Sequence, residues 1–135
     1  MPEYLTDAHS LLWYLYQPSR LGLAAQAAFT EADAGSARIH VPAPALAEVL
    51  MAVEKGRIPG ASLPSLLIHL ESIRTSDNYH LSPLLPEVVL NSHVLTVIPD
   101  IFDRLIVAEA IARSLPLLTI DGLLRDSGLV QVVWD

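Results

Sequence analysis

The sequence alternates short apolar segments, each about the length of one strand, with longer segments of helical periodicity. The strand-like segments are residues 4–6, 39–41, 79–81, 115–120 and 130–133. Helices are predicted from about residue 8, over residues 23–34, 45–55, 63–74, 84–95 and 102–113, and between the last two strands. Strands separated by helices favour a parallel sheet with helices on both faces. The sequence therefore predicts an α/β protein of order β-α-α-β-α-α-β-α-α-β-α-β.

The size and hydrophobicity of the chain limit its organisation. A chain of 135 residues is expected to form one domain, residues 1–135. Hydrophobic residues make up 52% of it and its mean hydropathy is +0.42, so we expect part of this apolar surface to contact another chain. The longest segment without a charged residue, residues 58–70, is too short for a membrane span of about 20 residues. With no signal-peptide pattern and no cysteine, the sequence predicts a cytoplasmic protein without disulfides.

The charge balance restricts how the chain could act on nucleic acid. The net charge is −7, and Lys55 is the only lysine among 8 basic residues. Broad electrostatic binding of nucleic acid needs many basic side chains that neutralise phosphates. Any chemistry on nucleic acid would therefore work through bound cations and a few arginines, and a basic protein partner is favoured.

Two aspartates directly follow strand-like segments. Asp7 follows residues 4–6, and Asp121 follows residues 115–120, where alternation places Thr119 on the same face as Asp121. The carboxyl ends of parallel strands meet at one edge of a sheet, so both acids are expected there. Asp7 is also typical of a helix N-cap, and Asp121 with Gly122 is typical of a turn.

Three further acids lie in segments predicted to be helical or to begin a helix. Glu48 lies in an apolar helical segment; it could face solvent, but facing inward it would need a pairing partner or a cation. Asp100 is typical of an N-cap, and Asp103 would then occupy the first turn of the same helix. Arg104 beside it could be a surface charge or contact the acids or a phosphate.

Together these acids predict a metal site. Clustered carboxylates repel one another and raise one another's pKa values unless a cation neutralises them. Oxygen ligands without any cysteine indicate Mg²⁺ or Mn²⁺. We expect Asp7 and Asp103 to hold the principal ion, with Glu48 and Asp121 completing the cluster and Asp100 as a further candidate ligand.

Four segments resemble, in order, the motifs of PIN-domain toxins, the VapC-like ribonucleases of bacterial and archaeal toxin–antitoxin pairs. They are residues 4–13 (YLTDAHSLLW), 44–49 (PALAEV), 99–110 (PDIFDRLIVAEA) and 115–121 (LPLLTID). The resemblance spans the chain from Tyr4 to Trp134. It departs from the motifs at Ile101, where many relatives have Pro, and at Ala8, where many have Thr; neither change removes a candidate ligand.

The resemblance implies a three-layer α/β/α fold with a five-stranded parallel sheet. It also implies an endoribonuclease that depends on Mg²⁺ or Mn²⁺, forms a homodimer and is neutralised by a cognate antitoxin. The acidic site residues of the family fall on Asp7, Glu48, Asp103 and Asp121. Single-stranded or looped RNA is the expected substrate, with Arg104 and, more weakly, Thr119 as substrate contacts.

The residues argue against two alternatives and leave a third open. A receiver domain typically has paired acids after the first strand and a late lysine, whereas Asp7 has no acidic neighbour and Lys55 lies mid-chain. A haloacid-dehalogenase-type phosphatase would have a second aspartate where His9 stands. The third alternative is a catalytically weak PIN-like interaction module whose acidic cleft docks a basic peptide.

Overall fold

A computed structural model describes all 135 residues and contains one five-stranded sheet. The strand order is β3-β2-β1-β4-β5, and every neighbouring pair is parallel. The strands are β1 (Glu3–Thr6), β2 (Arg38–Pro42), β3 (Tyr79–Ser82), β4 (Leu117–Leu118) and β5 (Val132–Val133). The prediction of a parallel α/β sheet is confirmed.

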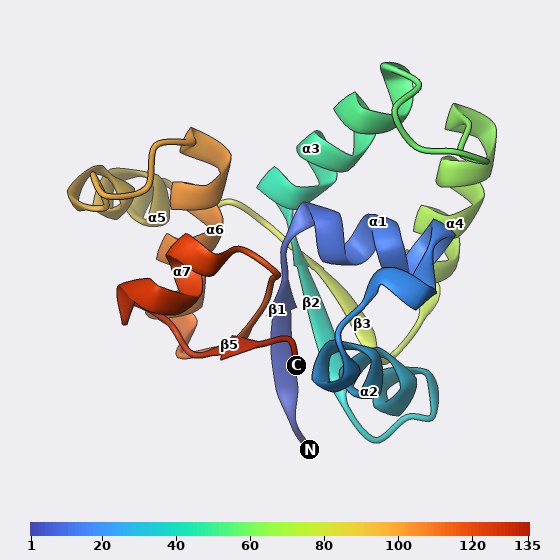
Figure 1. Ribbon diagram of the computed structural model, residues 1–135, viewed down its shortest axis with the longest axis horizontal. Coiled ribbons are helices and arrows are strands. Elements are labelled where there is room, and N and C mark those ends of the chain that lie inside the picture. Colours follow the sequence, from blue (N-terminus) through green and yellow to red (C-terminus); the bar gives the residue numbers. More distant parts are fainter.

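Seven α-helices connect and cover the strands: α1 (Ala8–Tyr16), α2 (Leu23–Asp33), α3 (Ala43–Glu54), α4 (Leu63–Thr75), α5 (Pro86–Asn91), α6 (Ile101–Arg113) and α7 (Gly122–Ser127). Figure 1 shows α1 to α4 on one side of the sheet and α5 to α7 on the other. Right-handed crossovers produce this division, because the chain first steps from β1 to β3 and then returns past β1 to β4 and β5. None of the helices is both long enough and apolar enough to cross a membrane.

Buried side chains lie on both faces of the central strands because helices cover both. Leu5, Ile39, Val41 and Leu117 are completely buried, and Leu5 lies opposite Leu117 in the register of β1 and β4. Such strands are typical of parallel sheets. Fully burying one aliphatic side chain of this size stabilises the fold by about 1.5–3 kcal/mol, so the sheet is a firm base for groups at its edges.

Three predicted elements differ in extent from the structure, and one of them, the strand predicted over residues 130–133, pairs only at Val132–Val133. The helix predicted over residues 84–95 is α5 followed by a separate 3₁₀ turn, Ser92–Val94. Pro86 begins α5 because proline fits the first turn of a helix, where no backbone donor is needed. The strand predicted over residues 115–120 contributes only Leu117–Leu118 to the sheet. Beyond it the hydroxyl of Thr119 accepts a hydrogen bond from the Asp121 N–H at 3.1 Å and turns the chain into α7.

The carboxyl ends of β1 and β4 mark the point where the strand order reverses. These two strands are neighbours in the sheet, but the chain leaves them toward opposite sides. The Asp7 N–H donates to the Leu118 carbonyl at 3.2 Å and joins the two ends. In open α/β sheets, ligands bind in the crevice outside such a switch point.

Candidate functional site

The two strand-end aspartates hold helices at the switch point. Asp7 caps α1 by accepting a hydrogen bond from the Ser10 N–H at 2.9 Å, and it is only 7% exposed. Asp121 caps α7 by accepting from the Leu123 N–H at 2.8 Å. The capping interpretation of Asp7 is therefore confirmed, and Asp121, which was interpreted as part of a turn, also caps a helix. Since a cap engages one carboxylate oxygen, each side chain keeps a second oxygen for other contacts.

Helices α3 and α6 bring three more carboxylates together. One carboxylate oxygen from each of Glu48, Asp100 and Asp103 lies within 4.8 Å of the others. Asp100 also caps α6 by accepting from the Asp103 N–H at 3.1 Å, as its sequence position predicts. Glu48 is half-buried, which fits the inward-facing alternative. Glu48, Asp100 and Asp103 thus form a group of three candidate ligands, and the assignment of the principal ion to Asp7 and Asp103 stays a prediction.

All five acids line one cavity of about 470 Å³, here called the acidic pocket: Asp7, Glu48, Asp100, Asp103 and Asp121. Its remaining walls are His9, Trp13 and Ile120. The acids come from β1, α3, α6 and the turn after β4, so residues more than 100 positions apart meet at the edge of the sheet. The structure thus brings together every acid that the sequence singled out.

Burial and mutual repulsion shift the titration of this pocket. Burial raises the pKa of Glu48 to about 7, and the nearby carboxylates of Asp103 and Asp100 add to the shift. Burial likewise raises the pKa of Asp103 to about 6, with contributions from Asp100 and Asp7. The pKa of Asp7 is also raised by burial, although hydrogen bonds from Thr119 and Ser10 oppose the effect. A carboxylate cluster of this kind carries unfavourable charge near neutral pH.

The donor set of the acidic pocket fits a divalent cation. Every candidate ligand atom is a carboxylate oxygen, the ligand type that hard cations such as Mg²⁺ and Mn²⁺ prefer. A cation would compensate for the burial of these carboxylates and for the repulsion between them, which together raise the pKa values of Glu48 and Asp103. The open volume around the ligands also leaves space for water and substrate oxygens, which Mg²⁺ usually retains.

The two predicted substrate contacts have structural partners of their own. The Arg104 Nε donates a hydrogen bond to the Ile98 carbonyl, which ties the loop before α6 to that helix. Thr119 is fully buried and supports the turn to Asp121. Neither residue lines the acidic pocket. Their assignment as substrate contacts stays a prediction.

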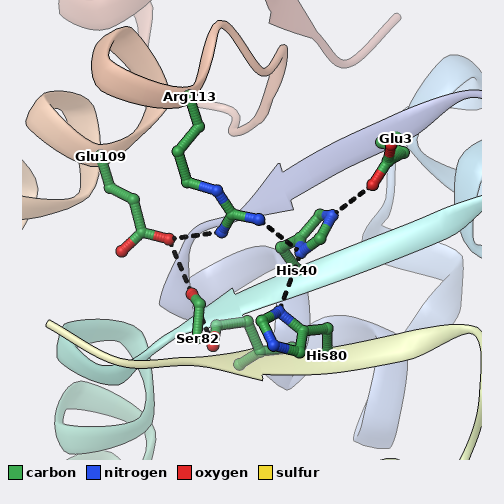
Figure 2. Close-up of polar contacts among 7 residues, drawn as sticks. Glu3, His40, His80, Ser82, Glu109 and Arg113 are labelled. Atoms are coloured by element: carbon green, nitrogen blue, oxygen red, sulfur yellow. Dashed lines mark hydrogen bonds and ion pairs between the residues drawn. The ribbon is translucent and has the colours of Figure 1, made fainter.

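A second polar network, which the sequence did not single out, joins α6 to β1, β2 and β3 (Figure 2). Glu109 Oε2 accepts hydrogen bonds from Ser82 Oγ at 2.7 Å and from Arg113 at 3.0 Å, and Arg113 also donates to His40 Nδ1 at 3.0 Å. Arginine can only donate, so His40 Nδ1 is an acceptor and its Nε2–H donates to Glu3 at 2.7 Å. Burial lowers the pKa of His40, which keeps the ring neutral. No metal-binding group of acids or histidines forms there.

Comparisons with known proteins agree with this architecture. The family model of the PIN domain matches residues 4–127. The complex VapBC2 from Rickettsia felis, solved with a DNA fragment from its promoter, contains a chain with 16% identity and a TM-score of 0.71, covering 98% of this chain and 99% of that one. VapC20 from Mycobacterium tuberculosis, a toxin that cleaves the sarcin–ricin loop, has 13% identity and a TM-score of 0.67, covering 96% of this chain and 98% of its own. No curated protein matches the sequence significantly.

The family model covers all four motifs, and the full-length likeness to both solved structures supports the same fold. The three-layer α/β/α architecture with its five-stranded parallel sheet follows the expectation from the motifs. The chain therefore belongs to the PIN domain family.

Proposed function

We propose that this protein is a metal-dependent endoribonuclease and the toxin of a toxin–antitoxin pair. The observation that carries the proposal is the acidic pocket at the switch point of a PIN-domain sheet, where Glu48, Asp100 and Asp103 approach within 4.8 Å. Few arrangements other than cation binding make such a cluster favourable at neutral pH.

The residues of the acidic pocket would have different roles according to their positions. Glu48, Asp100 and Asp103 would hold Mg²⁺ or Mn²⁺, with Asp7 and Asp121 completing the charge of the site. The bound cation would polarise a phosphodiester oxygen and lower the pKa of a water molecule. Because Asp7, Asp100 and Asp121 are fixed by the helices that they cap, their carboxylates keep their positions before substrate arrives.

Single-stranded or looped RNA is the proposed substrate, because an exposed backbone can enter an open pocket that a regular duplex cannot. The solved relatives include a VapBC complex and a toxin that cleaves an RNA loop. By analogy we propose a cognate antitoxin as the protein partner, a homodimer as the assembly and the cytoplasm as the site of action.

The proposal is tested with the purified chain, single-stranded RNA and a divalent metal. We expect cleavage with Mg²⁺ or Mn²⁺ and none with EDTA. Asp103→Asn removes a ligand without changing side-chain volume and should lower the cleavage rate at least ~100-fold. Asp77→Asn, at an exposed aspartate in the turn before β3, is the matched control and should cleave like the wild type. RNA cleavage that persists in EDTA, or an Asp103→Asn variant with full activity, would refute the proposal.

A second candidate function is an interaction module whose acidic pocket docks a basic peptide. The negative charge of the pocket favours it, and an arginine inserted among the acids would compete with the metal. The same experiment distinguishes the two, because a docking module would bind such a peptide without cleaving RNA under any metal condition.

A further inference from the structure

Three of the chain's 8 basic residues converge on a second cavity beside the acidic pocket. This cavity of about 400 Å³ lies between α1 and the end of α3, and we call its cationic wall the basic groove: Arg20, Lys55 and Arg57. The acidic pocket and the second cavity share His9, Trp13 and Glu48 as lining residues, so the two are contiguous. In a protein of net charge −7, this concentration of positive charge next to the candidate metal site indicates a binding site for an anion.

The cations of the basic groove are available to bind an anion. Arg74, Arg113 and Arg125 each form an ion pair with an acid. Arg20, Lys55 and Arg57 are exposed and have no carboxylate within ion-pair distance. An unpaired exposed cation binds a phosphate without first breaking an ion pair.

The backbone at the end of α3 places Lys55 and Arg57 beside the same cavity. Lys55 ends α3, and Gly56 adopts a positive φ of 67°, a conformation that favours glycine. The Arg57 N–H then donates to the Ala52 carbonyl at 3.2 Å, which folds the chain back over the end of α3. Lys55 lies seven residues after Glu48, about 10 Å along the helix, so the groove begins close to the acidic pocket.

The third cation is held in place by an aromatic ring. The Arg20 guanidinium lies over the Trp13 ring with its Cζ 4.8 Å from the centroid, and it donates to Gln17 at 3.3 Å. Trp13 in turn packs against Trp134 at 5.7 Å between centroids. A guanidinium stacked on a ring loses less freedom when it binds, and its planar fork suits phosphate oxygens.

We propose that Arg20, Lys55 and Arg57 bind backbone phosphates of the RNA strand that flank the bond cut in the acidic pocket. This inference rests on the proposed function. It explains how a protein with a net negative charge can hold a negatively charged RNA strand. Phosphate contacts position a strand without reading its sequence, so the groove sets the path of the strand. An acidic peptide of a protein partner is the other ligand with suitable charge; the continuity with the candidate metal site favours RNA.

The inference is tested by the salt dependence of RNA binding. Binding of a short fluorescein-labelled single-stranded RNA is measured by anisotropy at several salt concentrations, with Mg²⁺ present and every variant carrying Asp103→Asn to prevent cleavage. Removing one phosphate contact should lower the slope of log affinity against log salt by about 0.7. Arg20→Gln, Lys55→Gln and Arg57→Gln should each do so, and the triple variant should lose about 2. Arg38→Gln removes an exposed, unpaired arginine at the start of β2 and is the matched control, with no change expected.

The outcomes separate this inference from the proposed function. If the chain with Asp103 intact fails to cleave RNA with any metal, the proposed function fails. If that chain cleaves RNA but the triple variant keeps the slope of the Asp103→Asn parent, or the parent does not bind RNA, the inference about the groove is wrong. If the triple variant retains RNA binding but no longer binds a fluorescein-labelled oligoglutamate peptide that the Asp103→Asn parent binds, the groove binds protein and the inference is overturned. Thermal unfolding of each variant checks that these exposed substitutions leave the fold intact.

Discussion

At the scale of single residues, the acids of the acidic pocket combine a structural role with a chemical one. Asp100 caps α6 through one oxygen and approaches Glu48 and Asp103 closely. From the sequence its capping role was predicted, since an aspartate before a helix satisfies free N–H groups. Its proximity to Glu48 could not be predicted in the same way, because that distance depends on how α3 and α6 pack.

The two roles of Asp100 can be separated by substitution. Asp100→Ser keeps a side-chain oxygen that can cap α6 but removes the carboxylate. We expect stability within about 0.5 kcal/mol of the wild type and Mn²⁺ binding weakened about 10-fold. Urea unfolding and a metal titration measure the two effects. Unchanged Mn²⁺ affinity would show that Asp100 is only a cap.

Glu109 offers a test of the second polar network. Its side chain is 4% exposed, and its Oε1 is buried without a hydrogen-bond partner, so the carboxylate is incompletely compensated. Glu109→Gln should keep the contacts with Ser82 and Arg113 while removing a buried charge, and should raise the free energy of unfolding by about 1 kcal/mol. Glu109→Ala, which removes those contacts, should lower it by about 2 kcal/mol. Urea denaturation measures both, and a Gln variant less stable than the wild type would contradict the reasoning.

At the scale of secondary-structure elements, the site depends on how α3 and α6 meet at the sheet edge. Each helix was predicted from its apolar periodicity, with bounds within two residues of the observed ones. The short β4 was predicted too long, because Leu115 to Ile120 are apolar and apolarity alone does not show where pairing ends. That end is set by the contact of Asp7 with Leu118 and by the Thr119 turn.

The burial of carboxylates on these elements, together with the repulsion between them, should make stability depend on pH when metal is absent. The pKa values of Glu48 and Asp103 are raised in the folded state from 4.5 to about 7 and from 3.8 to about 6. The folded state therefore holds protons that the unfolded chain releases, and stability is lost as pH rises from about 4 to about 7. In EDTA we expect a lower unfolding midpoint at pH ~8 than at pH ~5.

Metal should reverse this loss. A cation at about 100 times its dissociation constant should stabilise the folded state by ~2.7 kcal/mol at neutral pH. Glu48→Gln removes one titrating group and should flatten the pH profile in EDTA. Thermal unfolding across pH, with and without Mn²⁺, measures the pH profile of the wild type, the profile of Glu48→Gln and the stabilisation by metal. If stability in EDTA instead rose between about pH 4 and about pH 7, the predicted direction of the pH dependence would be wrong.

At the scale of the whole molecule, apolar surface remains exposed, as the composition predicted. Five large apolar side chains of the segment from α5 to the start of α6 are at least 41% exposed: Leu85, Val89, Leu90, Val94 and Val97. Exposed apolar side chains that gather in one segment are typical of a contact with another chain. This segment is therefore a candidate for the interface of the proposed homodimer.

Light scattering after size-exclusion chromatography tests that assembly. We expect the wild type to run as a dimer and the double variant Leu90→Lys with Val94→Lys to run as a monomer, because two charges in an apolar interface are costly. Both positions are exposed, at 69% and 65%, so the fold should persist. Leu23→Lys, at an 81% exposed leucine on α2, serves as the control. A double variant that still dimerises would exclude this surface.

The sequence alone determined the alternation of strands and helices, the parallel sheet and the caps at Asp7 and Asp100, because these depend on local periodicity and on hydrogen bonds between near neighbours. It also indicated which acids belong to one site, through their positions after strands and in helices. Only the tertiary structure decided that Glu48 lies within 4.8 Å of Asp100 and Asp103, and that Arg20, Lys55 and Arg57 line one groove. Those distances are set by the packing of α1, α3 and α6 against the sheet, an interaction between segments distant in sequence that no local pattern records.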